Sequence, residues 1–265
     1  VSCVSYSPDG KYFISAGDES VRLWESDACE QKSVFSFDHP SETHVAWSAD
    51  GNEFAAVTES GEAKFWDATT RQQVGGYEQD EGDFRNLSYS RDGRFIAICD
   101  DKTILLLDAQ SKKLIKKLRE HSQNVHDVAF SPDSNTLYSG GKDGALEVWD
   151  MQSCRHLRTL TDVIGTIVTI DISADGHQLL VSTTQSGCVI VQVANGQQRA
   201  VFANTDFKLS SAHFGPDGDY FLTTANDNSV RLWDAETVDE LCYFDFARRT
   251  LDARFNPDGS QILVA

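Results

Sequence analysis

Apolar and polar residues alternate at a spacing of two along short runs of this 265-residue chain. Val4 and Tyr6 share one side of such a run, and Val21 and Leu23 repeat the pattern after the next turn. This spacing is typical of β-strands, in which successive side chains lie on opposite faces. The corners between the runs contain Pro-Asp-Gly or Ala-Asp-Gly, which favour tight turns. The pattern therefore predicts an all-β protein.

A motif whose fullest form is apolar-x-aromatic-Ser-Pro-Asp-Gly returns at an almost fixed interval. Its copies begin at Val4, Val45, Leu87, Val128, Ile170, Ala212 and Ala253. Successive copies are therefore 41 or 42 residues apart. Such self-similarity indicates a repeat architecture, in which each copy is one supersecondary unit.

Each repeat has room for four short strands. In the fourth repeat the pattern predicts an inner strand over 125–131, two middle strands over 136–140 and 145–150, and an outer strand over 156–160. A four-stranded sheet cannot bury both of its faces alone, so neighbouring repeats are expected to stack.

The dipeptide Trp-Asp ends the expected third strand in three repeats, at Trp66-Asp67, Trp149-Asp150 and Trp233-Asp234. With this dipeptide and its period, the chain resembles the WD-repeat family over essentially its whole length. The resemblance implies a β-propeller of four-stranded antiparallel blades around a central channel. It also implies a hydrogen-bonded tetrad in the fourth repeat, formed by His121, Ser139, Asp143 and Trp149. Other repeats lack parts of this tetrad, so apolar stacking is expected to dominate their stability.

We expect a single propeller domain over residues 1–265, with seven blades of which the last is incomplete. The expected repeats cover about 1–40, 41–81, 82–123, 124–164, 165–206, 207–247 and, in part, 248–265. Half a blade cannot close a ring. We therefore expect a fragment of a longer chain, whose last blade is completed by strands from the opposite terminus. Further repeats or an N-terminal effector domain are the alternative.

The charge balance is acidic, with 41 Asp and Glu against 23 Lys and Arg, for a net charge of −18. Such a surface repels phosphate backbones and anionic membranes, so direct nucleic-acid and membrane partners are not expected. Six widely spaced cysteines contain no Cys-x-x-Cys pair, which argues against a zinc site or a disulfide framework. Reduced thiols and a location in the cytoplasm or nucleus are the simpler interpretation.

The sequence contains no strong sign of catalysis. His39 with His44, and His121 with His126, share a spacing of five, but no other ligands recur beside them. Gly-x-Ser-x-Gly is absent, and Gly140-Gly141-Lys142 lacks the spacing of a phosphate-binding loop. We therefore predict no catalytic, cofactor-binding or metal-binding residues, and no enzyme, although a propeller hydrolase stays an open alternative.

Family members usually engage partners where loops enter the inner strands. Alignment of the repeats places nine residues there: Thr43, Asp83, Arg85, Asn124, His126, Thr166, Lys208, Ser210 and Arg249. The basic run from Lys112 to Arg119 aligns with an outer strand. We interpret it as protection of a sheet edge, with a docking patch for an acidic partner as the alternative.

These observations favour a non-catalytic interaction scaffold within a larger protein or complex. The expected partners are other proteins or peptides, including basic or phosphorylated segments. Two alternatives remain: a regulatory propeller attached to a signalling ATPase or kinase, and a subunit of an RNA-processing assembly.

Overall fold

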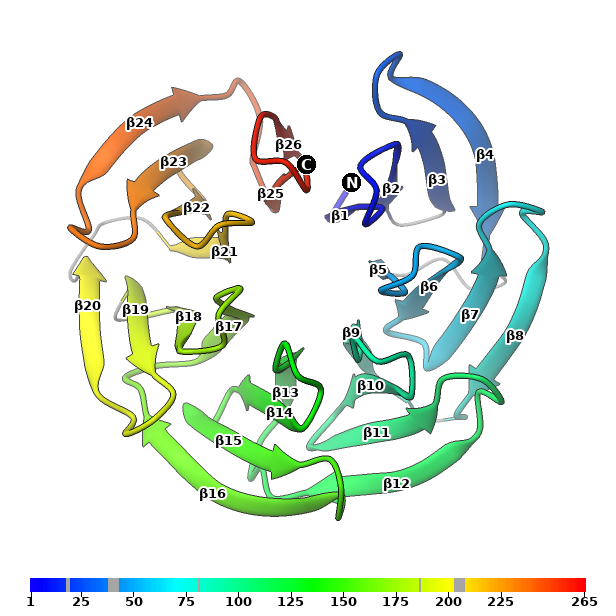
Figure 1. The fold of residues 1–265 in the computed structure, drawn as a ribbon, viewed down its shortest axis with the longest axis horizontal. Coiled ribbons are helices and arrows are strands. Elements are labelled where there is room, and N and C mark those ends of the chain that lie inside the picture. The colour runs from blue at the N-terminus through cyan, green and yellow to red at the C-terminus, as the bar shows by residue number, and fades with distance from the viewer. Residues whose placement is uncertain (18–19, 38–42, 81, 186, 203–207) are drawn as a thin grey trace.

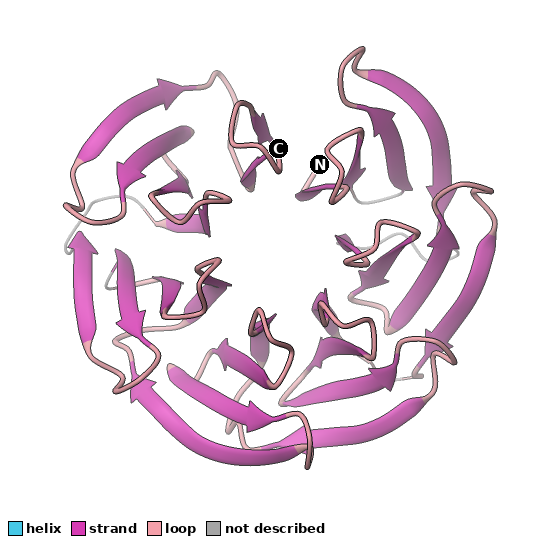
Figure 2. Ribbon diagram, viewed as in Figure 1, coloured by secondary structure: helices cyan, strands magenta, loops and turns pink. Residues whose placement is uncertain are grey.

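The structure, a computed structural model, describes residues 1–17, 20–37, 43–80, 82–185, 187–202 and 208–265. Within these ranges the secondary structure consists of strands joined by turns, and the sheets stand side by side around a central axis (Figures 1 and 2). The all-β prediction is confirmed. Six sheets have four strands and a seventh has two.

The strands follow the chain order within every sheet. The first and second sheets hold β1 (Cys3–Tyr6), β2 (Tyr12–Ala16), β3 (Ser20–Glu25), β4 (Glu30–Ser36), β5 (Thr43–Trp47), β6 (Glu53–Thr58), β7 (Glu62–Asp67) and β8 (Gln73–Glu78). The third and fourth hold β9 (Phe84–Tyr89), β10 (Phe95–Asp100), β11 (Thr103–Asp108), β12 (Leu114–Arg119), β13 (Val125–Phe130), β14 (Thr136–Gly141), β15 (Ala145–Asp150) and β16 (Arg155–Asp162). The fifth, sixth and seventh hold β17 (Ile167–Ile172), β18 (Gln178–Thr183), β19 (Gly187–Gln192), β20 (Gln198–Phe202), β21 (Leu209–Phe214), β22 (Tyr220–Ala225), β23 (Ser229–Asp234), β24 (Glu240–Asp245), β25 (Ala253–Phe255) and β26 (Ile262–Val264).

Each sheet is antiparallel, and each four-stranded sheet has its first strand nearest the axis and its last strand on the rim (Figure 1). This is the blade of a β-propeller. The four strands predicted for the fourth repeat are confirmed, with the outer strand longer than expected at Arg155–Asp162. Of the seven expected blades, the described residues form six complete ones, not seven, together with the two inner strands of a seventh sheet.

Apolar side chains fill the space between successive blades. Between the first two blades, Phe35 on the outer strand of one packs edge-on against Phe54 of the next, with ring centroids 5.1 Å apart. Between the third and fourth, Leu106 and Trp149 belong to one buried cluster. Full burial of one such side chain contributes about 1.5–3 kcal/mol, so these layers dominate the stability of the ring.

The four tetrad residues of the fourth blade are in hydrogen-bond contact. Ser139 Oγ accepts the Trp149 indole N–H at 2.8 Å and lies 2.8 Å from His121 Nε2. The other imidazole nitrogen, Nδ1, lies 3.1 Å from the carboxylate oxygens of Asp143. The sixth blade retains only the pair in which Trp233 donates to Thr223 at 2.9 Å.

Candidate functional site

Four inner strands carry a β-bulge close to where they enter the blade. In β13, Val125 and Asp127 face the adjacent Gly141 and Gly140, which leaves His126 as an extra residue. The same shift leaves Val168 and Ser210 extra in β17 and β21. A related shift lies between Phe84 and Leu87 of β9, around Arg85. Bulges re-aim side chains out of the ladder, and they are frequent near functional sites.

These bulges form an arc over the third to sixth blades, and three of its residues, Arg85, His126 and Ser210, belong to the predicted binding set. Val168 completes the arc in the fifth blade and was not predicted. The sequence does contain a signal for these bulges. Val125 and Val128 of the inner strand are three residues apart, whereas apolar residues on one face of a regular strand are two residues apart.

The third and fourth blades bring four predicted residues together. Arg85 Nη2 donates to Asp83 Oδ2 at 2.7 Å, and Asn124 Nδ2 lies 3.4 Å from the same oxygen. The His126 ring bonds through Nδ1 to the carbonyl of Ile167 in the next blade at 2.9 Å. Burial, reinforced by the positive charge of Arg85, lowers the pKa of His126, so this imidazole is neutral at physiological pH.

The remaining predicted residues do not join this group. The Thr43 side chain is buried, because β5 pairs with β6 from its first residue without a bulge. Thr166 is half-buried, and its N–H donates to the Thr184 hydroxyl. Lys208 and Arg249 are exposed at the start of the sixth blade and the seventh sheet.

Sequence reasoning missed two exposed residues near the four grouped ones. Lys142 is exposed, and its N–H donates to the carbonyl of Asn124 at 2.8 Å. Ile164 is 72% exposed, the highest value among the large apolar side chains described. Lys142 lies in the tight corner between β14 and β15, and Ile164 lies in the bend between β16 and β17. Neither has a distinctive sequence context.

The basic strand β12 binds its neighbours on the rim. Lys116 Nζ donates to the Cys154 carbonyl at 2.7 Å, and Lys117 Nζ donates to Gln79 Oε1 at 2.6 Å. Lys112 Nζ pairs with Glu53 and lies 4.8 Å from the Phe65 ring centroid. These contacts agree with a role in covering the sheet edge, the first of the two interpretations.

Side chains on the inner strands also link successive blades. Asp127 Oδ2 accepts the Ile170 N–H at 2.7 Å, which joins the fourth blade to the fifth. Thr169 Oγ1 accepts the N–H of Ala212 at 3.1 Å, which joins the fifth to the sixth. These acceptors stand two residues after the first apolar residue of their strand, at equivalent positions.

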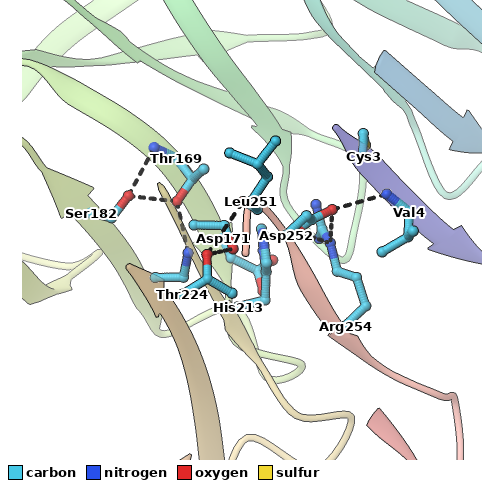
Figure 3. Close-up of polar contacts among 12 residues, drawn as sticks. Cys3, Val4, Thr169, Asp171, Ser182, His213, Thr224, Leu251, Asp252 and Arg254 are labelled. Atoms are coloured by element: carbon cyan, nitrogen blue, oxygen red, sulfur yellow. Dashed lines mark hydrogen bonds and ion pairs between the residues drawn. The ribbon is translucent and has the colours of Figure 1, made fainter. Parts of the chain in front are cut away.

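The same contact recurs between the seventh sheet and the first blade. Asp252 Oδ2 accepts the Val4 N–H at 3.2 Å, and strands β25 and β1 are in contact (Figure 3). Beside it, Asp171 Oδ2 accepts the Phe214 N–H at 2.8 Å between the fifth and sixth blades. We call these interblade bonds of the inner strands the inner belt.

The side chains of His213 and Arg254 complete the inner belt. His213 of β21 is buried between the carboxylates of Asp171, with Nδ1 3.8 Å from Oδ2, and Asp252, with Nε2 3.2 Å from Oδ1 (Figure 3). Arg254 lies 3.4 Å from Asp252 and lines a central cavity of about 310 Å³. Burial opposes ionisation of Asp171 and Asp252, but His213 and Arg254 outweigh it and lower the pKa of both carboxyl groups.

No cluster of three His, Cys, Asp or Glu side chains able to hold a metal ion occurs among the residues that the structure describes. His39 lies outside the described residues, while His121 and His126 are bonded as described above. The six cysteines are unpaired thiols, and burial raises the pKa of Cys3 to about 12. In the described ranges, no helix has the length and apolar character needed to cross a membrane.

Comparison with known families agrees with this geometry. The family model described as WD domain, G-beta repeat matches residues 1–25, 112–150 and 196–234. The chain is a β-propeller that contains WD repeats. The matches end at Glu25, Asp150 and Asp234, the last residues of third strands in three of its blades.

Relatives of this WD-repeat propeller include proteins of different kinds. It is 26% identical to apoptotic protease-activating factor 1 of Danio rerio over 85% of the chain and 18% of that protein. It is 21% identical to target of rapamycin complex subunit wat1 of Schizosaccharomyces pombe over 90% of the chain and 65% of the relative. Pre-mRNA-processing factor 19 of Bos taurus is 22% identical over 51% of the chain and 27% of its own length. The propeller thus spans only part of each of these relatives.

Proposed function

We propose that this WD-repeat propeller is a non-catalytic scaffold that binds other proteins or peptides in the cytoplasm or nucleus. The proposal rests on the different positions of two sets of side chains on the inner strands. Inner-belt carboxylates such as Asp127 bond the backbone of the next blade, which stiffens the ring. The bulged residues are turned out of the ladder, and Arg85 and His126 are only half-buried, so that a partner can reach them.

The names of the relatives support the same proposal. One is a subunit of the target of rapamycin complex, and another is a pre-mRNA-processing factor. The second name favours a subunit of an RNA-processing assembly as the alternative role. The name apoptotic protease-activating factor 1 denotes a regulator, which agrees with the regulatory role in the other alternative, a propeller attached to a signalling ATPase or kinase.

We infer further that residues 1–265 form one domain and that its ring has seven members. The bond from Asp252 to Val4 repeats the one from Asp127 to Ile170. The seventh sheet is therefore joined to the first blade in the same way as the fourth blade is joined to the fifth. The turn of the seventh repeat also packs against the first blade. A Cβ added to Gly10 of the first blade would lie 3.4 Å from Pro257 of that turn.

The outer surfaces beside the seventh sheet favour two additional strands there. Phe244 of β24 and Phe35 of β4 hold equivalent positions, since they pair with Val230 and Val21 of the adjacent strands. Phe244 is nevertheless 42% exposed, whereas Phe35 is only 8% exposed. On the other side, Trp24 is half-buried. Two strands added to β26 would cover both surfaces, which hydrogen exchange of the whole protein would report as protection of β26 amides. Unprotected β26 amides would contradict a completed seventh blade.

The binding face is proposed at the mouth formed by the loops that enter the inner strands, around Asp83, Arg85, Asn124 and His126. Arg85 and Arg249 can pair with phosphorylated segments through bidentate hydrogen bonds. Asp83 and the acidic surface as a whole suit basic segments. A partner there would contact the arc of bulges and the exposed loops beside it.

Affinity capture tests the scaffold and its face separately. The whole wild-type protein should capture specific partners in fixed ratios, and a protein that captures none beyond an unloaded matrix would contradict the scaffold. The variant R85A/H126A/R249A should lose those partners. If it retains all of them, the proposed face is wrong.

A matched control comes from the opposite end of the blades. Arg94, Lys113 and His177 are exposed and follow the turns on that end. The variant R94A/K113A/H177A removes two cationic side chains and one histidine, as the binding-face variant does, and should retain every partner. Equal losses in the two variants would point to a general charge effect instead of a defined face.

A further inference from the structure

His213 occupies an unusual position in the inner belt. Its side chain is 4% exposed, and its two nitrogens face carboxylates from two other sheets, Asp171 in the fifth blade and Asp252 in the seventh. A neutral imidazole has one N–H, so it would direct a lone pair at one of the carboxylates. The contacts are at ion-pair distances, and neither nitrogen makes a hydrogen bond, so what suits both carboxylates is the positive charge of the imidazolium form.

Asp252 passes this contact on to the first blade. Its Oδ1 faces His213, while its Oδ2 accepts the N–H of Val4. The carboxylate is almost fully buried, so its charge needs the positive partners beside it. His213 of the sixth blade therefore lies in a line of contacts that runs from Asp171 of the fifth blade, through Asp252 of the seventh sheet, to Val4 of the first blade (Figure 3).

We propose that His213 is a proton-dependent clasp of the ring. With its proton, it ties the fifth blade to the seventh sheet and holds Asp252 against Val4. Without the proton, Asp252 loses a charged partner, and the contact between the seventh sheet and the first blade loosens. This device is independent of the binding face proposed above.

The neighbouring charges isolate His213 as the titrating group near neutral pH. The titratable or charged groups that face this site from the packed strands are Asp127, Asp171, Asp252, Arg254 and Cys3. Burial raises the pKa of Asp127 to about 6 and that of Cys3 to about 12. Asp127 is therefore half ionised near pH 6, whereas above about pH 7 the carboxylates are ionised and the thiol stays neutral well into the alkaline range.

The direction of the pH effect follows from the pKa of His213. Burial and the charge of Arg254 disfavour the imidazolium, but Asp171 and Asp252 outweigh them, so the His213 pKa is raised above 6.5. A raised pKa means that the folded ring holds a proton that the unfolded chain has released. The stabilisation is therefore complete below pH 6.5 and is lost as the pH rises through the folded pKa.

Unfolding of the whole protein between about pH 6 and about pH 9 tests the proposal. For the wild type, the unfolding equilibrium constant should rise by up to about tenfold per pH unit in the window above pH 6.5. H213Q should lose this slope. H177Q, which removes an exposed histidine, should keep it. An unchanged slope in H213Q would overturn the clasp.

Two measurements on the wild type keep the test decisive if H213Q does not fold. The imidazole of His213, followed by NMR, should titrate above pH 6.5, and a lower value overturns the proposal. Hydrogen exchange, corrected for intrinsic rates, should show β1 and β25 losing protection at alkaline pH more than β10 does. An equal change in all three strands would also overturn it.

Discussion

Ser139→Ala removes a hydroxyl that two buried partners share in the fourth blade. Ser139 is fully buried, and its Oγ lies 2.8 Å from both the Trp149 indole nitrogen and His121 Nε2. The substitution leaves both partners without this bond in a site that water does not reach. Each buried unsatisfied group costs about 1–3 kcal/mol, so the expected loss in the free energy of unfolding is about 2–6 kcal/mol.

Thr223→Val in the sixth blade is the matched control. Thr223 accepts a single bond, from the Trp233 indole at 2.9 Å, and valine preserves the shape of the side chain. Only one partner is left unsatisfied, so the expected cost is about 1–3 kcal/mol.

Urea denaturation followed by circular dichroism measures both variants under the same conditions. Ser139→Ala should be more destabilising than Thr223→Val by about the cost of one unsatisfied group. If Ser139→Ala costs the same as Thr223→Val or less, His121 gains nothing from the hydroxyl. The view of the tetrad as a shared polar network would then be refuted.

Three other substitutions test the packing and the inner belt by the same denaturation assay. Leu106→Ala, at a fully buried position between the third and fourth blades, should cost about 2–5 kcal/mol, and a loss below about 1 kcal/mol would argue against tight packing there. Gly141→Ala would place a Cβ 2.0 Å from the Asn124 carbonyl oxygen, so a destabilisation of about 1–3 kcal/mol is expected, whereas a neutral result would contradict the close approach. Burial raises the pKa of Asp127 to about 6, so wild-type stability should fall as the pH rises from about 4 to about 6, and Asp127→Asn should remove that part of the slope.

The repeat and its strands were predictable because turn chemistry is local. Pro-Asp-Gly and its variants fix where the inner hairpins reverse, as Pro132-Asp133-Ser134 does between β13 and β14, and the alternation on either side then sets the strands. The number of blades was harder to predict from the sequence. Six complete blades and half of a seventh are observed, and stacking of neighbouring sheets does not itself limit their number.

The candidate site was predictable only in part. Aligning the repeats selected Arg85 and His126, because the bulge holds the same place in both of their strands. The same alignment placed Thr43 wrongly at the surface, since β5 has no bulge and this side chain is buried. The clasp around His213 was not predicted, because the carboxylates that meet there come from repeats far apart in the sequence.

The bulges have a consequence for how freely the channel mouth can vary. A bulged residue such as His126 has no partner residue opposite it in the ladder, so replacing its side chain sacrifices no cross-strand pairing. Its neighbours Val125 and Asp127 keep the packing and the interblade bond. Recognition and most of the interblade bonding are thus encoded at adjacent positions, with the His126 ring adding one bond to the Ile167 carbonyl of the next blade. Propellers with the same frame could present very different chemistry to their partners.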